Sequence, residues 1–263
     1  MGHALSCAIQ RRREPEMIKT ETSQTETIRL AAKEVHIWRI PLLQSHNLIQ
    51  SFRSVLSQDE VERADRFHFE THSRRFIVAR AAMRQILGRY MEIPPHRLEF
   101  SYGARGKPEF PPELNDSAIT FNLSHSRDFS LLAVARFLSL GIDIEFVNHE
   151  VATEEIAERF FSANEIAMLR ALPPSERVEA FFCVWTRKEA YIKALGEGLA
   201  VPLDSFDVAF GPNVPPGLLR SEASSAEVSC WSMYDIATEP GYKAALVAEG
   251  AEHRLRQLEW RES

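Results

Sequence analysis

Two kinds of hydrophobic periodicity alternate along this chain of 263 residues, and their order restricts the fold more than any single motif does. The segments with strand-like patterns are 35–40, 119–123, 130–135, 142–146, 201–210 and 242–248. Residues 76–90 and 175–196 instead repeat apolar side chains at helical spacing. Because each long helical segment lies among strand segments, the sequence predicts an α+β fold in two halves, each a small sheet with one long helix.

Three sections are expected along the chain. Residues 1–33 hold few large apolar side chains, which predicts a mobile N-terminal extension. Residues 34–139 are expected to form the first α+β half, and residues 140–263 the second half, which carries the candidate metal site. A site between the two halves would draw residues from both.

Composition argues against several functional classes. The net charge of −6 opposes binding to the phosphate backbone of nucleic acid, because such proteins usually carry a clearly basic domain. Every apolar run is far shorter than the roughly 20 residues that a bilayer requires, so no membrane partner is expected. The three cysteines, Cys7, Cys183 and Cys230, are widely spaced and support neither a disulfide framework nor a zinc site. A cytoplasmic protein is expected.

The segment 141–146 places two carboxylates on one face of a strand. Asp143 and Glu145 stand two residues apart, so their side chains point the same way, whereas Ile142 and Ile144 point to the opposite face. Like charges at this distance repel unless a cation compensates them, and oxygen ligands suit Mg²⁺. A solvent-exposed acidic face would produce the same pattern, so the spacing alone leaves both interpretations open.

The helical segment 175–196 has a carboxylate within its apolar stripe. With Ser175 as the N-cap and Gly196 as the stop, a turn of about 100° per residue places Glu189 inside the stripe and Lys193 at its edge. An unpaired buried charge is costly, so Glu189 is expected to meet a metal ion or a lysine. The alternative is an ordinary helical ion pair between Glu189 and Lys193, which stand four residues apart.

Ser124 and His125 suggest a serine nucleophile beside its base. Neighbouring strand residues point to opposite faces, however, so these two cannot form a hydrolase dyad. A phosphate contact by His125 and a purely structural histidine are the two interpretations that stay open.

Positive charge concentrates between residues 63 and 84 of this acidic protein, and Lys107 adds a cation in a glycine-containing loop. Arginine binds phosphate in a bidentate manner, and lysine neutralises it as a point charge. Ion pairs with neighbouring acidic residues would account for most of the arginines, so only two or three are expected to contact a ligand.

These motifs resemble the paired signatures of the surfactin-type (Sfp-like) 4'-phosphopantetheinyl transferases. The first signature is Gly-Ile-Asp-Ile-Glu at residues 141–145, and the second is Trp-Thr-Arg-Lys-Glu-Ala-Tyr-Ile-Lys at residues 185–193. The alanine in the second resembles the W-x-x-K-E-A subgroup. Gly-Lys-Pro at residues 106–108 and Asn-Leu-Ser-His-Ser at residues 122–126 look like further landmarks in the expected order.

The resemblance implies a monomer of two similar halves related by pseudo-twofold symmetry, which binds coenzyme A and Mg²⁺, with Mn²⁺ as an alternative ion. Asp143, Glu145 and Glu189 match the acidic metal site of the family. Glu189 and Lys193 match its catalytic residues, a base and a cation for phosphoryl charge. The residues that match contacts to coenzyme A are Arg63, Arg75, Lys107, Ser124, His125 and Lys188.

The implied reaction transfers the 4'-phosphopantetheine group of coenzyme A to a serine of an apo acyl or peptidyl carrier protein and releases 3',5'-ADP. A metal-dependent phosphodiesterase or hydrolase on coenzyme A or a nucleotide would use the same carboxylates with water as the acceptor. A non-catalytic carrier-protein-binding module is a third alternative, and the intact carboxylates argue against it.

Overall fold

The computed structural model describes residues 28–103, 106–196, 201–211 and 214–262. Its strands are β1 (Glu34–Pro41), β2 (Ser101–Tyr102), β3 (Pro108–Glu109), β4 (Ile119–Ser126), β5 (Phe129–Arg136), β6 (Leu140–Phe146), β7 (Phe206–Val208), β8 (Leu218–Ser221), β9 (Trp231–Asp235), β10 (Tyr242–Glu249) and β11 (Arg254–Glu259). Its α-helices are α1 (His46–Arg53), α2 (Gln58–Asp65), α3 (Glu70–Met91), α4 (Glu154–Phe160), α5 (Ala163–Ala171), α6 (Pro174–Leu195) and α7 (Glu227–Cys230). The predicted α+β class is confirmed.

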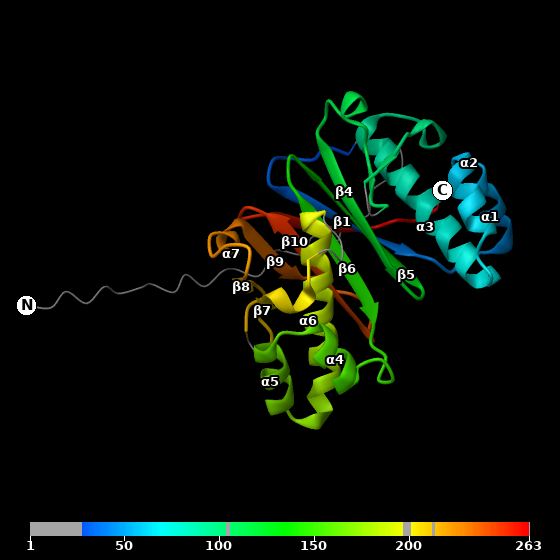
Figure 1. The fold of residues 1–263 in the computed structure, drawn as a ribbon. Helices are drawn as coiled ribbons and strands as arrows, with labels where there is room; N and C mark the ends of the chain where they lie inside the picture. The colour runs from blue at the N-terminus through cyan, green and yellow to red at the C-terminus, as the bar shows by residue number, and fades with distance from the viewer. Residues whose placement is uncertain (1–27, 104–105, 197–200, 212–213, 263) are drawn as a thin grey trace, which may run out of the picture.

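The strands form two main sheets, each with one long helix on its outer face (Figure 1). The strand order is β11-β1-β5-β4 in the first sheet and β6-β10-β9 in the second. Strands β1 and β11 are parallel, and the other pairs are antiparallel. The strand expected over residues 201–210 is reduced to β7, because Leu203–Ser205 form a 3₁₀ turn. Among the described helices, none has the length and apolar character needed to cross a membrane.

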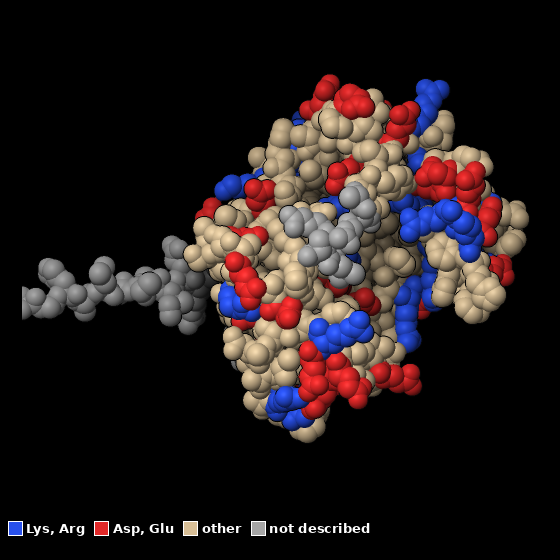
Figure 2. All heavy atoms as spheres, in the orientation of Figure 1, with Lys and Arg blue, Asp and Glu red and all other residues tan. Residues whose placement is uncertain are grey.

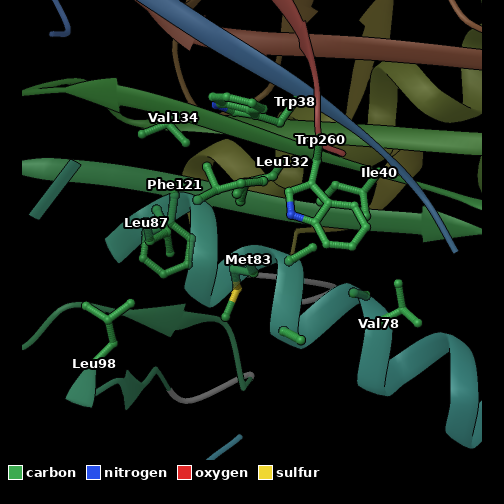
Figure 3. Close-up of a cluster of buried hydrophobic side chains, with 14 of the residues drawn as sticks. Trp38, Ile40, Val78, Met83, Leu87, Leu98, Phe121, Leu132, Val134 and Trp260 are labelled. Carbon is green, nitrogen blue, oxygen red and sulfur yellow. The ribbon is translucent and has the colours of Figure 1, made fainter. Parts of the chain in front are cut away.

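Three apolar cores arrange these elements in four layers, helix, sheet, sheet and helix. In the first core, Met83 and Leu87 of α3 face Trp38 of β1 and Leu132 of β5 (Figure 3). The second core lies between α6 and the second sheet, and the third lies between the two sheets. Because strand side chains alternate, successive residues of β5 and β6 enter different layers.

The end of the chain departs from the expected division into halves. Strand β11 lies late in the second half of the sequence, yet it pairs with β1, and Leu258 and Trp260 pack in the first core. Leu30, which lies within the expected extension, is also buried in that core. The remainder of the expected extension, residues 1–27, lies outside the described residues.

Helix α6 begins two residues earlier than predicted. Its first residue is Pro174 and its N-cap is Pro173, whereas Ser175 was expected as the N-cap. Proline is favoured at the first helical position because its missing N–H would have no partner there. Gly196 ends the helix with φ of 75°, as expected for a glycine stop.

Candidate active site at the seam between the two sheets

Strand β6 carries the predicted carboxylates on the side that faces helix α6, and a glycine permits the close approach. A Cβ atom at Gly141 would lie 2.2 Å from the carbonyl oxygen of Ala190 and 2.4 Å from the amide nitrogen of Ala194. Any larger residue would therefore push the helix away from the strand. Ile142 and Ile144 point into the core between the sheets, so the predicted alternation is correct.

Asp143 lies at the centre of a compact polar cluster. Its side chain is almost fully buried, and its Oδ1 accepts hydrogen bonds from Lys193 Nζ at 2.5 Å and Ser124 Oγ at 2.9 Å. Lys193 also donates to Ser124 Oγ at 3.1 Å. The described residues supply no donor to Asp143 Oδ2, which is buried. Because a buried acceptor without a partner is costly, this oxygen is a position where a bound cation or donor would be stabilised.

Glu145 and Glu189 add further negative charge beside Asp143. Burial, and then the neighbouring charge of Asp143, raises the pKa of Glu145 to about 7. Burial also raises the pKa of Glu189, although the charge of Lys193 opposes this shift. Lys193 bonds to Asp143, so the alternative of an isolated helical ion pair with Glu189 does not describe it.

The number and position of the carboxylates determine which metal ion the cluster could hold. In the described part of the chain, no three His, Cys, Asp or Glu side chains are gathered closely enough to form a ready ligand set. Mg²⁺ needs fewer, because it is usually held by one or two carboxylates and completes its shell with water and substrate phosphates. Asp143 and Glu145, with a free buried oxygen and a strong mutual repulsion, fit such a site.

His125 stands at the end of β4, where basic side chains gather. The pKa of His125 is lowered by desolvation and then by the charges of Lys193, Arg63 and Arg75. His125 is exposed, and the charges of these three cations disfavour its protonated form. A neutral imidazole among cations suits a hydrogen bond to an anionic ligand.

The two arginines near His125 differ in how firmly they are held. Arg75 Nη2 lies 2.6 Å from Asp128 Oδ1, while the guanidinium of Arg63 is exposed and lies over the ring of Phe76 at 5.3 Å. Figure 2 shows Lys and Arg side chains on the α3 side of a hollow between α3 and α6. Both arginines therefore remain candidates for a phosphate contact.

Other arginines of the basic segment have structural partners, as the ion-pair alternative predicted. Glu60 is buried between Arg80, at 3.4 Å, and Arg84, at 2.6 Å. Arg74 pairs with Glu70 at 2.6 Å on the surface of α3.

Lys107 links the two halves of the molecule at this site. Its Nζ donates to the backbone carbonyl of Lys193 at 2.9 Å and to that of Leu140 at 3.4 Å. These bonds satisfy a carbonyl near the C-terminal end of α6, where a cation is favourable. Burial lowers the pKa of Lys107, and the neighbouring charge of Lys193 adds to this, against Glu109.

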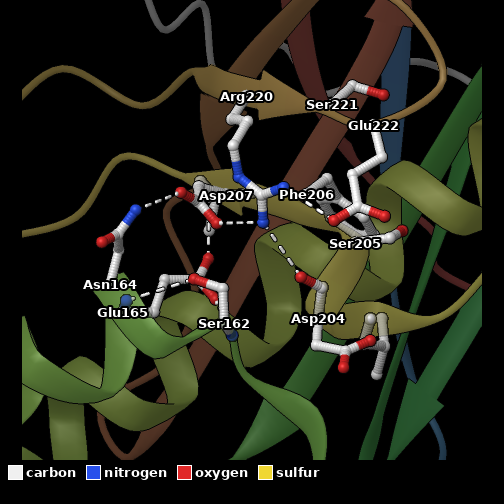
Figure 4. Close-up of polar contacts among 12 residues, drawn as sticks. Ser162, Asn164, Glu165, Asp204, Ser205, Phe206, Asp207, Arg220, Ser221 and Glu222 are labelled. Atoms are coloured by element: carbon white, nitrogen blue, oxygen red, sulfur yellow. Dashed lines mark hydrogen bonds and ion pairs between the residues drawn. The ribbon is translucent and has the colours of Figure 1, made fainter.

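The structure does not bring Lys188 to the acidic cluster. Its Nζ is fully buried on another side of α6, 2.8 Å from Glu165 Oε2, and it donates to the carbonyls of Leu203 and Phe206. Figure 4 shows Glu165 and the surrounding polar contacts, including Asp207. The helical projection alone could not reveal this, because α6 is covered on several sides. The geometry assigns Lys188 to the interior of the second half and not to a substrate contact.

Asn122 and Ser126, the first and last residues of the landmark at 122–126, were given no role from the sequence, but both contact β6. Asn122 Oδ1 accepts from the amide of Ile142 at 2.8 Å, and Ser126 Oγ donates to Glu145 Oε2 at 2.8 Å. The available signal was the spacing of Asn122, Ser124 and Ser126, which places three polar side chains on one face of a strand.

A pocket of about 220 Å³ opens beside Glu145. Its walls include the aromatic side chains of Phe146, Phe181, Phe182 and Trp185. The pocket is therefore a largely uncharged cavity that lies next to the charged cluster.

Comparison with known proteins agrees with this arrangement. Residues 139–247 match the 4'-phosphopantetheinyl transferase superfamily, and residues 44–136 match the family described as 4'-phosphopantetheinyl transferase, N-terminal. The chain is 38% identical to 4'-phosphopantetheinyl transferase HetI of Nostoc sp. over 221 residues, which cover 84% of this chain and 90% of HetI. It is 32% identical to 4'-phosphopantetheinyl transferase Sfp of Bacillus subtilis over 209 residues, which cover 79% of this chain and 88% of Sfp.

The match to a solved structure is more limited. The holo-[acyl-carrier-protein] synthase of Helicobacter pylori in complex with coenzyme A matches with a TM-score of 0.32 and 24% identity, over 41% of this chain and 96% of that chain. The sequence matches to HetI and Sfp extend over most of both chains and include the strand and helix that form the acidic cluster. This protein therefore belongs to the 4'-phosphopantetheinyl transferase family.

Proposed function

We propose that this protein transfers the 4'-phosphopantetheine group of coenzyme A to a serine of an apo acyl or peptidyl carrier protein, with Mg²⁺, and releases 3',5'-ADP. Family membership supports the transfer itself. The observation that carries the residue assignment is the Asp143 cluster, in which buried Asp143 bonds to Lys193 and lies beside the partly buried Glu145.

Asp143 and Glu145 would hold the metal ion, with Glu189 as a further ligand from α6. The unpartnered Oδ2 of Asp143 and the repulsion between Asp143 and Glu145 support this role. A bound Mg²⁺ would neutralise pyrophosphate charge and polarise the phosphoryl group, and Mn²⁺ prefers similar ligands.

Glu189 and Lys193 are the proposed catalytic residues. A carboxylate with a raised pKa suits a general base, so Glu189 would accept the proton of the carrier serine, directly or through a water. The serine oxygen forms a bond to the β-phosphorus of coenzyme A as the bond between that phosphorus and the bridging oxygen breaks. Lys193 would stabilise the negative charge that develops on the phosphoryl oxygens or on the leaving group.

The remaining predicted contacts are assigned to coenzyme A. Arg63, Arg75 and His125 would bind its phosphates at the basic end of the site, and Ser124 and Lys107, which both bond to Lys193, would contact it next to the acidic cluster. The aromatic pocket beside Glu145 suits the uncharged pantetheine arm. Lys188 is not retained among these contacts, because its Nζ is occupied inside the protein.

The test is incubation of an apo carrier protein with the purified protein, coenzyme A and Mg²⁺, followed by mass spectrometry of the carrier. We expect the carrier to gain one phosphopantetheine group, and we expect excess EDTA to prevent this. Consumption of coenzyme A with an unmodified carrier would indicate the hydrolase, and carrier binding without any reaction would indicate the non-catalytic module. Acyl and peptidyl carrier proteins should be tested in separate reactions, because the activity toward the two kinds of carrier can differ.

The proposal includes a monomer that acts in the cytoplasm without nucleic acid or membrane. The net charge of −6 supports the absence of nucleic acid, and the widely spaced cysteines support a reducing compartment. Light scattering during size-exclusion chromatography tests the oligomeric state.

A further inference from the structure

Strands β4 and β6 lie side by side although they belong to different sheets. Within the described residues, no backbone ladder joins them, and the edge of β6 that faces β4 must satisfy its N–H groups in another way. Buried backbone donors are costly when they have no partner. This is the edge next to the metal-site carboxylates, so the way it is held determines where they stand.

Polar side chains of β4 take the place of that ladder. Asn122 Oδ1 accepts from the amide of Ile142 at 2.8 Å, and Ser126 Oγ accepts from the amide of Phe146 at 3.0 Å. The two bonds join residues 20 positions apart in both cases, so the strands run in register and in the same direction. Asn122 and Ser126 thus hold the two ends of the segment that carries Asp143 and Glu145.

The hydrogen bonds of Ser126 also determine where its hydroxyl proton points. A hydroxyl group has one proton and two lone pairs. The amide of Phe146 occupies a lone pair, and the proton is directed to Glu145 Oε2 at 2.8 Å. The Ser126 hydroxyl group therefore bonds both to the backbone amide of Phe146 and to the carboxylate of Glu145. This restricts the rotamer of Glu145.

We infer that Ser126 is a positioning residue that orients the Glu145 carboxylate toward a divalent cation by fixing it to the end of β4. The inference rests on the proposed role of Glu145 as a metal ligand. Hydrogen-bond partners of metal ligands typically change metal affinity or activity by about 10–100-fold when they are removed. Ser126 is suited to such a role because it acts on the side chain and on the adjacent backbone together.

The experiment compares Ser126→Ala with Ser126→Thr, which keeps the hydroxyl on a strand that tolerates β-branching. Ser232→Ala is the matched control, because Ser232 also lies in a strand, is buried, and donates one hydrogen bond, to the carbonyl of Gly250 at 2.7 Å. Binding of Mn²⁺ is measured by electron paramagnetic resonance in the presence of coenzyme A. Amide hydrogen exchange over residues 140–146 is measured without metal.

We expect Ser126→Ala to bind Mn²⁺ about tenfold or more weakly than the parent protein. Ser126→Thr should recover most of the affinity, and Ser232→Ala should bind as the parent does. Exchange at the amide of Phe146 should accelerate in Ser126→Ala but not in the control. Parental Mn²⁺ affinity in Ser126→Ala would overturn the inference.

The failure of the proposed function would look different. A parent protein that neither binds Mn²⁺ nor modifies any carrier would remove the proposed function. The exchange measurement then still decides whether Ser126 positions β6, since unchanged exchange at Phe146 would overturn the inference in metal-free protein.

Discussion

Lys188→Met tests whether a signature lysine serves the fold or the substrate. The lysine side chain is completely buried, and its Nζ contacts Glu165 at 2.8 Å, the carbonyl of Leu203 at 2.7 Å and the carbonyl of Phe206 at 2.6 Å. Methionine keeps an unbranched stem of similar length but removes the charge and the three donors. The substitution therefore leaves one carboxylate and two carbonyl oxygens without this partner.

Removing one partner of a buried ion pair costs about 3–5 kcal/mol, because the other charge remains buried. We expect the lower end, about 3 kcal/mol, since two backbone amides at 2.9 Å still donate to Glu165. Glu165 can also take up a proton, because burial already raises its pKa. Urea unfolding should show a lower midpoint with an unchanged slope.

Lys243→Met is the matched control for this measurement. Lys243 lies 2.6 Å from Glu179, but both side chains are partly exposed, so its loss should cost only about 0–1 kcal/mol. In the Lys188→Met background, Glu165→Gln should recover part of the stability because the uncompensated charge is gone. If Lys188→Met unfolds like the parent and instead raises the KM for coenzyme A, the buried-pair assignment is wrong and Lys188 contacts the substrate.

Four further predictions follow from the site. Gly141→Ala should lose about 1–3 kcal/mol of stability and most of its transfer activity, because the new methyl group overlaps the backbone of α6 at 2.2 Å; thermal unfolding and kinetics check this. Glu189→Gln should lower kcat by about 10²–10⁴ with a smaller change in coenzyme A binding, and Glu189→Leu should stop transfer without unfolding metal-free protein, as kinetics and urea titrations can show. We propose that Arg75 binds the 3'-phosphate of coenzyme A, so Arg75→Ala should raise the KM for coenzyme A but not for dephospho-coenzyme A; an equal effect on both would contradict this role. Glu145 has a pKa of about 7 in the folded protein and about 4.3 in the unfolded protein, so the folded state binds more protons between these two pH values. The stability of the metal-free protein should therefore fall as the pH rises through this window. Urea titrations with EDTA should show a weaker pH dependence for Glu145→Gln.

The sequence predicted those parts of the fold that depend on local patterns. The alternation of Asp143 and Glu145 with Ile142 and Ile144 was enough to place two carboxylates on one face of β6. Gly196 likewise predicted the end of α6, because a left-handed residue there favours glycine. Such features need only a few neighbouring residues and one repeat.

Features that depend on distant partners could not be obtained in this way. The pairing of β11 with β1 joins the two ends of the chain, and nothing in the pattern of Arg254–Glu259 selects that partner. Lys188 and Glu165 pair across 23 positions, and a helical projection does not show this burial of Lys188 because it treats a helix as having one buried side. Helix α6 is instead buried on several sides, by the second sheet, α5 and the segment at β7.

The carboxylates and the basic side chains lie in different parts of the site, and this restricts the kinds of ligand that the site can bind. A pocket for an anion alone would not place Asp143, Glu145 and Glu189 beside it, because their negative charge would repel the anion and weaken binding. A pocket for a cation alone would not place Arg63 and Arg75 next to His125. Coenzyme A bound together with a divalent cation would meet both groups, since the cation and the pyrophosphate would lie at the carboxylates and the 3'-phosphate at the arginines. Without the cation, the carboxylates should repel the pyrophosphate, so coenzyme A affinity should depend on Mg²⁺ more strongly than the contacts of the arginines alone would require.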